Sequence, residues 1–198
     1  MVSNAGGRRT QILDAVIPLV GHFGFKKTSV KDLATAAGLT KQGLYLHFDS
    51  KEELLEAAMR RYFEEGLRIT REALERPGIR FQQRLIDALD SWFGRHLAHF
   101  NPASLEVVEP SGPAKAELAR IKRTYCKLLE SAIATAPEYA LRGHVCKPAE
   151  LACVLFQFGL TWKEGHSSRT AFRETLRLCV YACFPPGDGR KRDRGAAR

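Results

Sequence analysis

The sequence lacks the long hydrophobic run that a membrane span or a signal peptide requires. No stretch approaches the roughly 18 consecutive apolar residues of a membrane helix. The first residues, MVSNAGGRRTQILD, contain two arginines but no continuous apolar core and no small-residue cleavage site. We therefore expect a cytoplasmic protein with no membrane partner.

The sequence lacks the cysteine spacing that is typical of metal sites: it has five cysteines, but none of them form a CxxC pair. A chain of 198 residues can build a core without disulfides, so we expect reduced thiols. Cys179 and Cys183 lie four residues apart on one predicted helix face, a spacing that suits a soft metal or an oxidant sensor. A role as small core residues is favoured, since free cysteine is usually buried. We predict no metal and no cofactor.

Motifs of the common enzyme classes are also absent. The sequence has no GxxxxGK[ST] phosphate loop, no GxSxG nucleophile turn and no HExxH zinc motif. We therefore predict that the protein is not an enzyme and has no catalytic residues.

What the sequence does contain is helical periodicity along nearly its whole length. Hydrophobic residues make up 44% and charged residues 27% of the chain, as in an ordinary globular protein. Apolar residues recur every three or four positions, the spacing of one helix face. Glycine and proline separate the periodic segments, and none has strand alternation. We predict an all-α fold of about nine helices, the first three short.

Positive charge is spread unevenly. The net charge of +9 suits a polyanionic partner. Residues 1–65, however, hold nine basic and eight acidic residues, and residues 185–198 hold five and two, so the middle of the chain carries the remaining +5. Charge alone therefore does not mark the amino-terminal segment as a DNA-binding one.

A series of capping and turn residues does mark it. Ser29 is a suitable N-cap, with Asp32 in the capping-box position, for a helix from Val30 to Ala37. Gly38 can adopt the left-handed conformation that ends this helix. Thr40 can cap the next helix, from Lys41 to His47. Two short helices joined by so tight a turn describe a helix-turn-helix. Its predicted core residues are Val30, Leu33, Leu39, Leu44 and Phe48.

The exposed start of the second helix has DNA-reading chemistry, since a recognition helix enters the major groove by its amino-terminal end. Lys41 can donate to guanine, and Gln42 can pair with adenine. Gly43 leaves room for the backbone to approach the bases. Tyr45 and His47 have polar groups that suit phosphate oxygens.

A long helix follows at once. Ser50 is its predicted N-cap, and Glu53 would complete a second capping box. Lys51, at the positive end of this helix, is a natural phosphate ligand. The helix is predicted to run to about Glu75, about 37 Å at 1.5 Å per residue, and to connect two domains.

At these residues the stretch from Arg8 to Met59 resembles the DNA-binding domain of the tetracycline-repressor (TetR) family of bacterial regulators. The matching residues are Phe23-Gly24, Thr28 to Val30, Ala37 to Leu39, Gly43-Leu44-Tyr45, His47-Phe48 and Ser50 to Leu54. The resemblance implies an all-α homodimer whose second domain binds a small ligand that releases repression. It implies base contacts from Lys41, Gln42 and Gly43 and phosphate contacts from Tyr45, His47 and Lys51. Our predicted DNA-binding set adds the two caps, Ser29 and Thr40.

We predict a DNA-binding domain over residues 1–50, a ligand-binding and dimerisation domain over residues 51–184, and a disordered basic tail over residues 185–198. The last two helices are apolar on more than one side, which predicts a homodimer through them and a palindromic operator. The small-molecule effector is expected to contact large aromatic side chains and a histidine. These candidate ligand-binding residues are Trp92, His96, Tyr125, Phe156 and Trp162.

Several interpretations stay open. A non-specific architectural DNA-binding protein would need only basic charge, and a helical carrier or enzyme could keep a vestigial helix-turn-helix. Arg8 and Arg9, before the first helix, are placed to reach the DNA backbone or minor groove. Pro18 lies inside the first helix and is expected to kink it.

Overall fold

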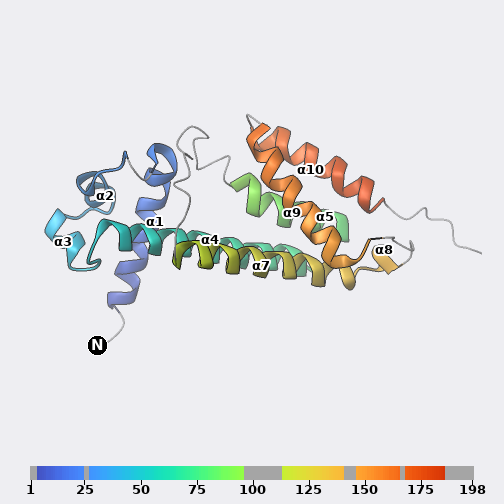
Figure 1. Ribbon diagram of the computed structural model, residues 1–198, viewed down its shortest axis with the longest axis horizontal. Coiled ribbons are helices and arrows are strands. Elements are labelled where there is room, and N and C mark those ends of the chain that lie inside the picture. The colour runs from blue at the N-terminus through green and yellow to red at the C-terminus, as the bar shows by residue number, and fades with distance from the viewer. Residues whose placement is uncertain (1–3, 25–26, 96–112, 141–145, 166–167, 186–198) are drawn as a thin grey trace, which may run out of the picture.

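The computed structural model describes residues 4–24, 27–95, 113–140, 146–165 and 168–185, and over these residues every regular element is a helix (Figure 1). The predicted all-α fold is confirmed. No helix of the described part is both long and apolar enough to cross a membrane. The α-helices are α1 (Asn4–Phe23), α2 (Val30–Ala36), α3 (Lys41–Tyr45), α4 (Lys51–Glu75), α5 (Phe81–Leu89), α7 (Pro113–Ala134), α8 (Pro137–Ala140), α9 (Pro148–Gly165) and α10 (Arg169–Cys183), and a π-helical turn, η1, spans Asp90–Gly94.

The amino-terminal domain is a small bundle of α1, α2 and α3 against the start of α4. Its core consists of buried apolar side chains from all four helices, and the predicted core residues Leu33, Leu44 and Phe48 are among them. Val30 and Leu39 pack on it while partly buried. Helix α1 continues through Pro18.

Helix α4 belongs to both halves of the molecule. Its first turns contribute Leu54, Leu55 and Ala58 to the amino-terminal core. Its last turns contribute Leu67 and Leu74 to the second core. Figure 1 shows it running from the amino-terminal domain along the second domain, with α7 beside it. The predicted bounds of this connecting helix, Lys51 to Glu75, are those observed.

The second domain packs α5, α7, α9 and α10 around an aromatic core. In it, α7 lies against α4 and α9, and α10 lies against α5 (Figure 1). Tyr125, Phe93, Phe172 and Phe184 are among its largest fully buried side chains. This large apolar core is what holds the end of α4 in place.

The even spacing of apolar residues after Phe81 predicts one continuous α-helix. The observed helix departs from this prediction. From Asp90 to Gly94 the backbone widens into the π-helical turn. The Asp90 carboxylate, 7% exposed, accepts hydrogen bonds from Arg169 (Nη2, 2.9 Å) and Arg173 (Nη1, 2.9 Å) of α10. These charge-assisted bonds tie η1 to α10.

Candidate nucleic-acid interface

The turn between α2 and α3 has the geometry that its residues predict. Ser29 accepts a hydrogen bond from the Asp32 backbone N–H (3.2 Å), and Asp32 accepts one from the Ser29 N–H (3.0 Å), so the capping box is complete. The Asp32 carboxylate also accepts a hydrogen bond from the Ser29 hydroxyl at 2.6 Å, and this bond, followed by that from the Ser29 N–H, holds the pKa of the Asp32 carboxyl below its ordinary value. Gly38 has φ +64°, a left-handed conformation that a residue with a Cβ rarely adopts. Helix α2 ends at Ala36, one residue before the predicted end.

The start of α3 is capped and exposed. The Thr40 hydroxyl accepts a hydrogen bond from the Gly43 N–H at 3.0 Å. Lys41 and Gln42 are exposed beside this cap. A Cβ added at Gly43 would lie 3.3 Å from Thr40 Oγ1, so glycine also lets the cap close tightly. The two long polar side chains are therefore presented from a fixed backbone.

The residues that follow α3 lie partly outside the predicted helix. It ends at Tyr45 with Leu46 as its C-cap, so the prediction of helix to His47 was wrong by two residues. Tyr45 is 48% exposed and His47 is half-buried. Leu46 is 84% exposed and was missed by the sequence analysis. The signal was available, because the predicted core residues Leu44 and Phe48 lie on one face and Leu46 is not among them. An exposed leucine there suits contact with a thymine methyl group.

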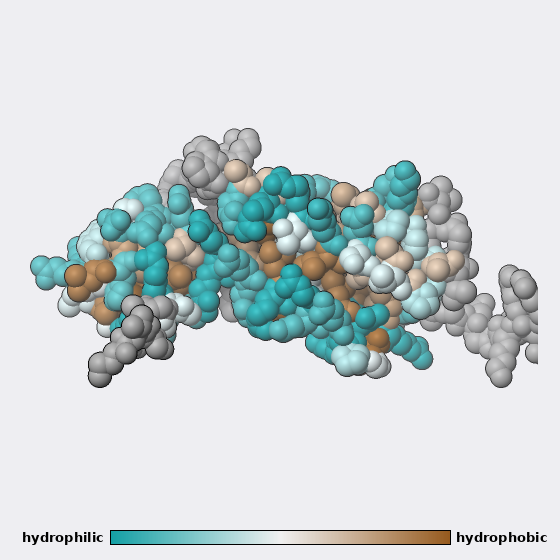
Figure 2. Space-filling model, turned by 90° about the horizontal axis from the view of Figure 1, so that it is seen from below, coloured by the Kyte–Doolittle hydropathy of each residue, from teal (hydrophilic) through white to brown (hydrophobic). Residues whose placement is uncertain are grey.

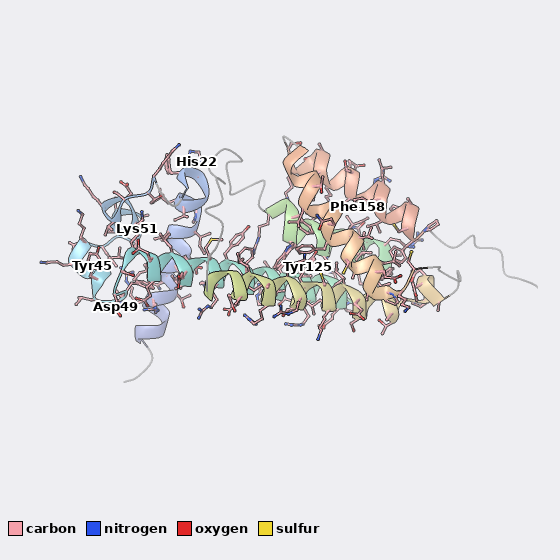
Figure 3. The ribbon with its side chains drawn as sticks, viewed as in Figure 1. His22, Tyr45, Asp49, Lys51, Tyr125 and Phe158 are labelled. Carbon is pink, nitrogen blue, oxygen red and sulfur yellow. The ribbon has the colours of Figure 1, made fainter. Side chains whose placement is uncertain are left out.

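The start of α4 continues the same surface. The Ser50 hydroxyl accepts from the Glu53 N–H at 3.0 Å, as predicted. The second half of the predicted capping box was wrong, because the Glu53 carboxylate accepts from the Asp49 N–H at 2.6 Å, one residue before the cap. Lys51 is half-buried in the first turn. Figure 3 shows Tyr45, Asp49 and Lys51 together at one end of the molecule, far from Tyr125.

The two arginines that were predicted to lie before the first helix are inside it, because α1 begins at Asn4, and both contact the protein itself. Arg9 lies over the Phe48 ring, 4.0 Å from its centroid, and donates to the His47 carbonyl and to Glu53 (2.6 Å). Arg8 donates to the Ala37 carbonyl at 3.4 Å. Arg9 thus holds together α1, the end of the helix-turn-helix and the first turn of α4. In this arrangement neither guanidinium extends away from the domain as a free arm.

Three of the five predicted ligand-binding residues come together in the second domain. The Trp92 and Tyr125 rings lie 4.4 Å apart, and Tyr125 and Phe156 lie 5.7 Å apart, measured between centroids. The Tyr125 hydroxyl is buried and has no hydrogen-bond partner in the described part of the chain, and burial raises the pKa of this hydroxyl well above its ordinary value. His96 and the Trp162 side chain lie outside the described residues.

The cysteine pair on α10 is half-buried and packs on the second core. A hydrogen bond from Cys179 lowers the pKa of the Cys183 thiol to about 7. No cluster of three or more metal-binding side chains occurs among the residues described.

The family comparison bears directly on this interface. Residues 12–58 match the family model described as "Bacterial regulatory proteins, tetR family". The chain is similar to the HTH-type transcriptional repressor KstR2 of Rhodococcus jostii (strain RHA1), with 40% identity over 63 residues, which are 32% of this chain and 31% of that protein. The match therefore spans about a third of each chain.

Solved structures extend the likeness to the rest of the fold. The reduced form of E. coli NemR superposes with a TM-score of 0.73 at 18% identity, covering 89% of this chain and 96% of that one. AibR in complex with isovaleryl coenzyme A and operator DNA gives a TM-score of 0.57 at 24% identity, covering 91% and 100%. Both helical domains thus share one overall arrangement with these proteins.

Proposed function

We propose that this chain is a ligand-responsive transcriptional repressor of the tetR family of bacterial regulatory proteins, because residues 12–58 match that family's model. As a homodimer it occupies a palindromic operator, and it leaves the operator when a small molecule binds the second domain. It works by binding and conformational change, without catalysis.

One observation carries this proposal: the exposed Lys41 and Gln42 at the capped start of α3. Both side chains are long enough to reach base edges, and their backbone is fixed by the Thr40 cap and the Gly38 turn. Lysine suits guanine and glutamine suits adenine, so the pair has the chemistry of sequence-specific reading.

The test begins with selection of a duplex from a random DNA library. Lys41→Ala and Gln42→Ala should each weaken binding of that duplex by about 1–3 kcal/mol and relax its sequence preference. Lys127→Ala, on an exposed position of α7, removes the same charge from the second domain and should change little. Fluorescence anisotropy at fixed salt measures all three. If both α3 variants bind like the wild type, these residues do not read the operator.

Phosphate contacts are proposed for Tyr45, His47 and Lys51, with Ser29 and Thr40 as caps at the DNA-facing ends of α2 and α3. Lys51→Ala should weaken selected and random duplexes alike and lower the salt slope of log K by about 1. Equal affinity of the wild type for selected and random DNA would instead indicate an architectural protein, since specific sites are typically bound about 10³-fold tighter or more.

The homodimer is proposed to form through α9 and α10. Leu155 and Phe156 of α9 are buried in the protomer's own core. Val154 and Phe158 of α9 and Leu178 of α10 are, by contrast, 44%, 39% and 63% exposed. Large apolar side chains exposed on two adjacent helices suit a self-complementary four-helix interface.

Sedimentation should give twice the chain mass of 22.1 kDa. Val154→Lys and Leu178→Lys should shift the equilibrium toward the monomer, because each buries a charge in the interface. Leu46→Lys, an equally conspicuous exposed leucine outside this face, should leave the dimer intact. A wild-type monomer at micromolar concentration would contradict the proposal.

The effector is proposed to bind at the aromatic cluster of Trp92, Tyr125 and Phe156, together with His96 and Trp162. An apolar or aromatic molecule with one polar group would satisfy the unpartnered Tyr125 hydroxyl. Quenching of tryptophan fluorescence identifies binders. Operator DNA should then weaken the effector by the same factor, about 5- to 150-fold, by which the effector weakens operator binding. Equal effector affinity with and without operator would contradict the switch.

A further inference from the structure

A groove of about 200 Å³ lies where the last turns of α4 meet α5 and α7. Arg71 and Glu75 of α4, Arg84 of α5 and Ser131 of α7 line it, with Leu74 and Leu128 supplying apolar wall. None of these residues belongs to the aromatic cluster proposed for the effector.

The guanidinium of Arg84 is only partly used. Its Nη1 donates to the Leu74 carbonyl at 2.6 Å, near the carboxyl end of α4, and so fixes the side chain in the groove. Its Nε is buried and has no hydrogen-bond partner among the described residues. A buried donor without an acceptor is costly, by about 1–3 kcal/mol.

Other arginines of this chain show what that edge of a guanidinium binds. Arg61, Arg120 and Arg169 each use Nε and Nη2 together to hold one carboxylate, from Asp14, Glu117 and Asp90 respectively. Arg84 has the same edge but no such carboxylate among the described residues. Arg71, exposed on the groove, adds a second guanidinium with no ion pair in the described part of the chain.

We propose that this groove binds a small organic acid, with its oxyanion on Arg84 and Arg71. The Ser131 hydroxyl is a further donor, and the short apolar part of the acid lies against Leu74 and Leu128. The groove is smaller than the roughly 300–1,000 Å³ of drug-sized pockets, so the acid is short. Glu75 on the rim opposes an anion and weakens the site.

The test uses hexanoate, 1-hexanol and inorganic phosphate as probes in calorimetric titrations of the full chain without DNA, up to about 10 mM. Hexanoate should bind saturably, while hexanol, which has the same tail without the charge, should not. Phosphate binding with the same variant pattern would support the oxyanion site and assign its ligand as a phosphate. Failure of both anions to bind, or equal binding of hexanol, would overturn the proposal and leave the proposed repressor untouched.

Four substitutions localise the binding. Arg84→Gln and the exposed Arg71→Gln should each weaken hexanoate about tenfold or more, as expected for a lost charged hydrogen bond. Arg80→Gln, an exposed arginine just before α5 that does not line the groove, should bind normally. Glu75→Gln should bind about two- to fivefold more tightly, because it removes a nearby negative charge. A gain of affinity cannot result from misfolding, so unchanged affinity in both Glu75→Gln and Arg71→Gln would exclude the groove.

Discussion

The two domains are stabilised in different ways. Among its described residues, the amino-terminal domain has ten buried core residues, and its shape depends on consecutive capping residues and on two left-handed glycines, Gly24 and Gly38. The described part of the second domain has a core of twenty-two buried residues and an ion-pair network that joins residues about 80 positions apart. Among the described residues, the amino-terminal domain, here called the head, is thus defined by local backbone geometry, and the second domain, here called the body, is defined by distant contacts. Substitutions in the two domains should therefore have separable effects.

Tryptophan makes the separation measurable. Both tryptophans, Trp92 and Trp162, are in the second domain, so their fluorescence reports on that domain alone. Helical circular dichroism reports on both domains. In a variant that destabilises only the head, part of the circular dichroism signal should be lost at a lower urea concentration than the tryptophan fluorescence signal.

The largest effect is expected from Asp90→Asn, which breaks the network of the second domain. Removing one partner of a buried ion pair is strongly destabilising, and we expect about 3 kcal/mol because Arg169 and Arg173 are themselves half exposed. Both spectroscopic signals should shift to lower urea. Glu174→Gln, which breaks the exposed pair with Arg177, should cost less than about 1 kcal/mol. Similar losses in both variants would mean that the network is not buried.

Gly38→Val should lower the stability of the head and leave the stability of the body unchanged. A valine in the left-handed conformation costs about 1–2 kcal/mol. The dichroism midpoint should fall and operator binding should weaken, while the tryptophan midpoint stays in place. Gly7→Val, in α1 with open space around it, is the matched control. A shift of the tryptophan signal by Gly38→Val would show that the domains unfold together.

Tyr125→Phe should stabilise the body by about 1 kcal/mol, because it removes a buried hydroxyl for which the described residues provide no hydrogen-bond partner. The same substitution should weaken effector binding if the hydroxyl is the polar handle of that site. Tyr139→Phe is the contrasting control, since that hydroxyl donates to the Cys146 carbonyl at 3.1 Å. Loss of stability in Tyr125→Phe would show that the hydroxyl is satisfied in solution.

The smallest effect concerns Glu53, which the head uses to join α1 to α4. The hydrogen bond from Arg9, and then that from the Asp49 N–H, lower the pKa of this carboxyl from its ordinary value of 4.5. A lowered pKa means stabilisation that is present above pH 4.5 and is lost as pH falls through the folded-state value. Glu53→Gln should therefore be less stable than wild type at pH 7, with the difference closing in acid. Its exposed neighbour gives the control, Glu52→Gln. If the stability difference between Glu53→Gln and the wild type persists at low pH, the ion pair with Arg9 is not its cause.

Sequence reasoning succeeded where structure depends on neighbouring residues. Ser29, Thr40 and Ser50 cap their helices as predicted because each N-cap bonds to a backbone N–H only three residues ahead. It failed where a hydrogen-bond partner is distant in the sequence, or where two neighbouring N–H groups could serve equally well as the donor. The partner of Arg9 is 44 residues away, and Glu53 binds the N–H one residue before the predicted one.

The second domain was harder for the same reason. Aromatic composition predicted that Trp92, Tyr125 and Phe156 would meet, since large apolar side chains gather in a core. The π-helical turn at Asp90 and the groove at Arg84 depend on contacts across several helices, which periodicity does not encode. Figure 2 shows the resulting surface from below, hydrophilic over most of its area with apolar residues gathered in the middle of the second domain.

Because α4 runs without a break from one core to the other, its number of residues fixes the rotation of the amino-terminal domain relative to the second domain. Each residue of an α-helix advances by about 1.5 Å and turns by about 100°. One residue inserted between Glu64 and Glu65 would swing the recognition helix about a quarter-turn around the body. An insertion of seven residues restores the facing direction to within about 20° but moves the head outward by about 10 Å. In the proposed homodimer, the length of α4 therefore sets which face of the DNA double helix the two recognition helices can contact at the same time.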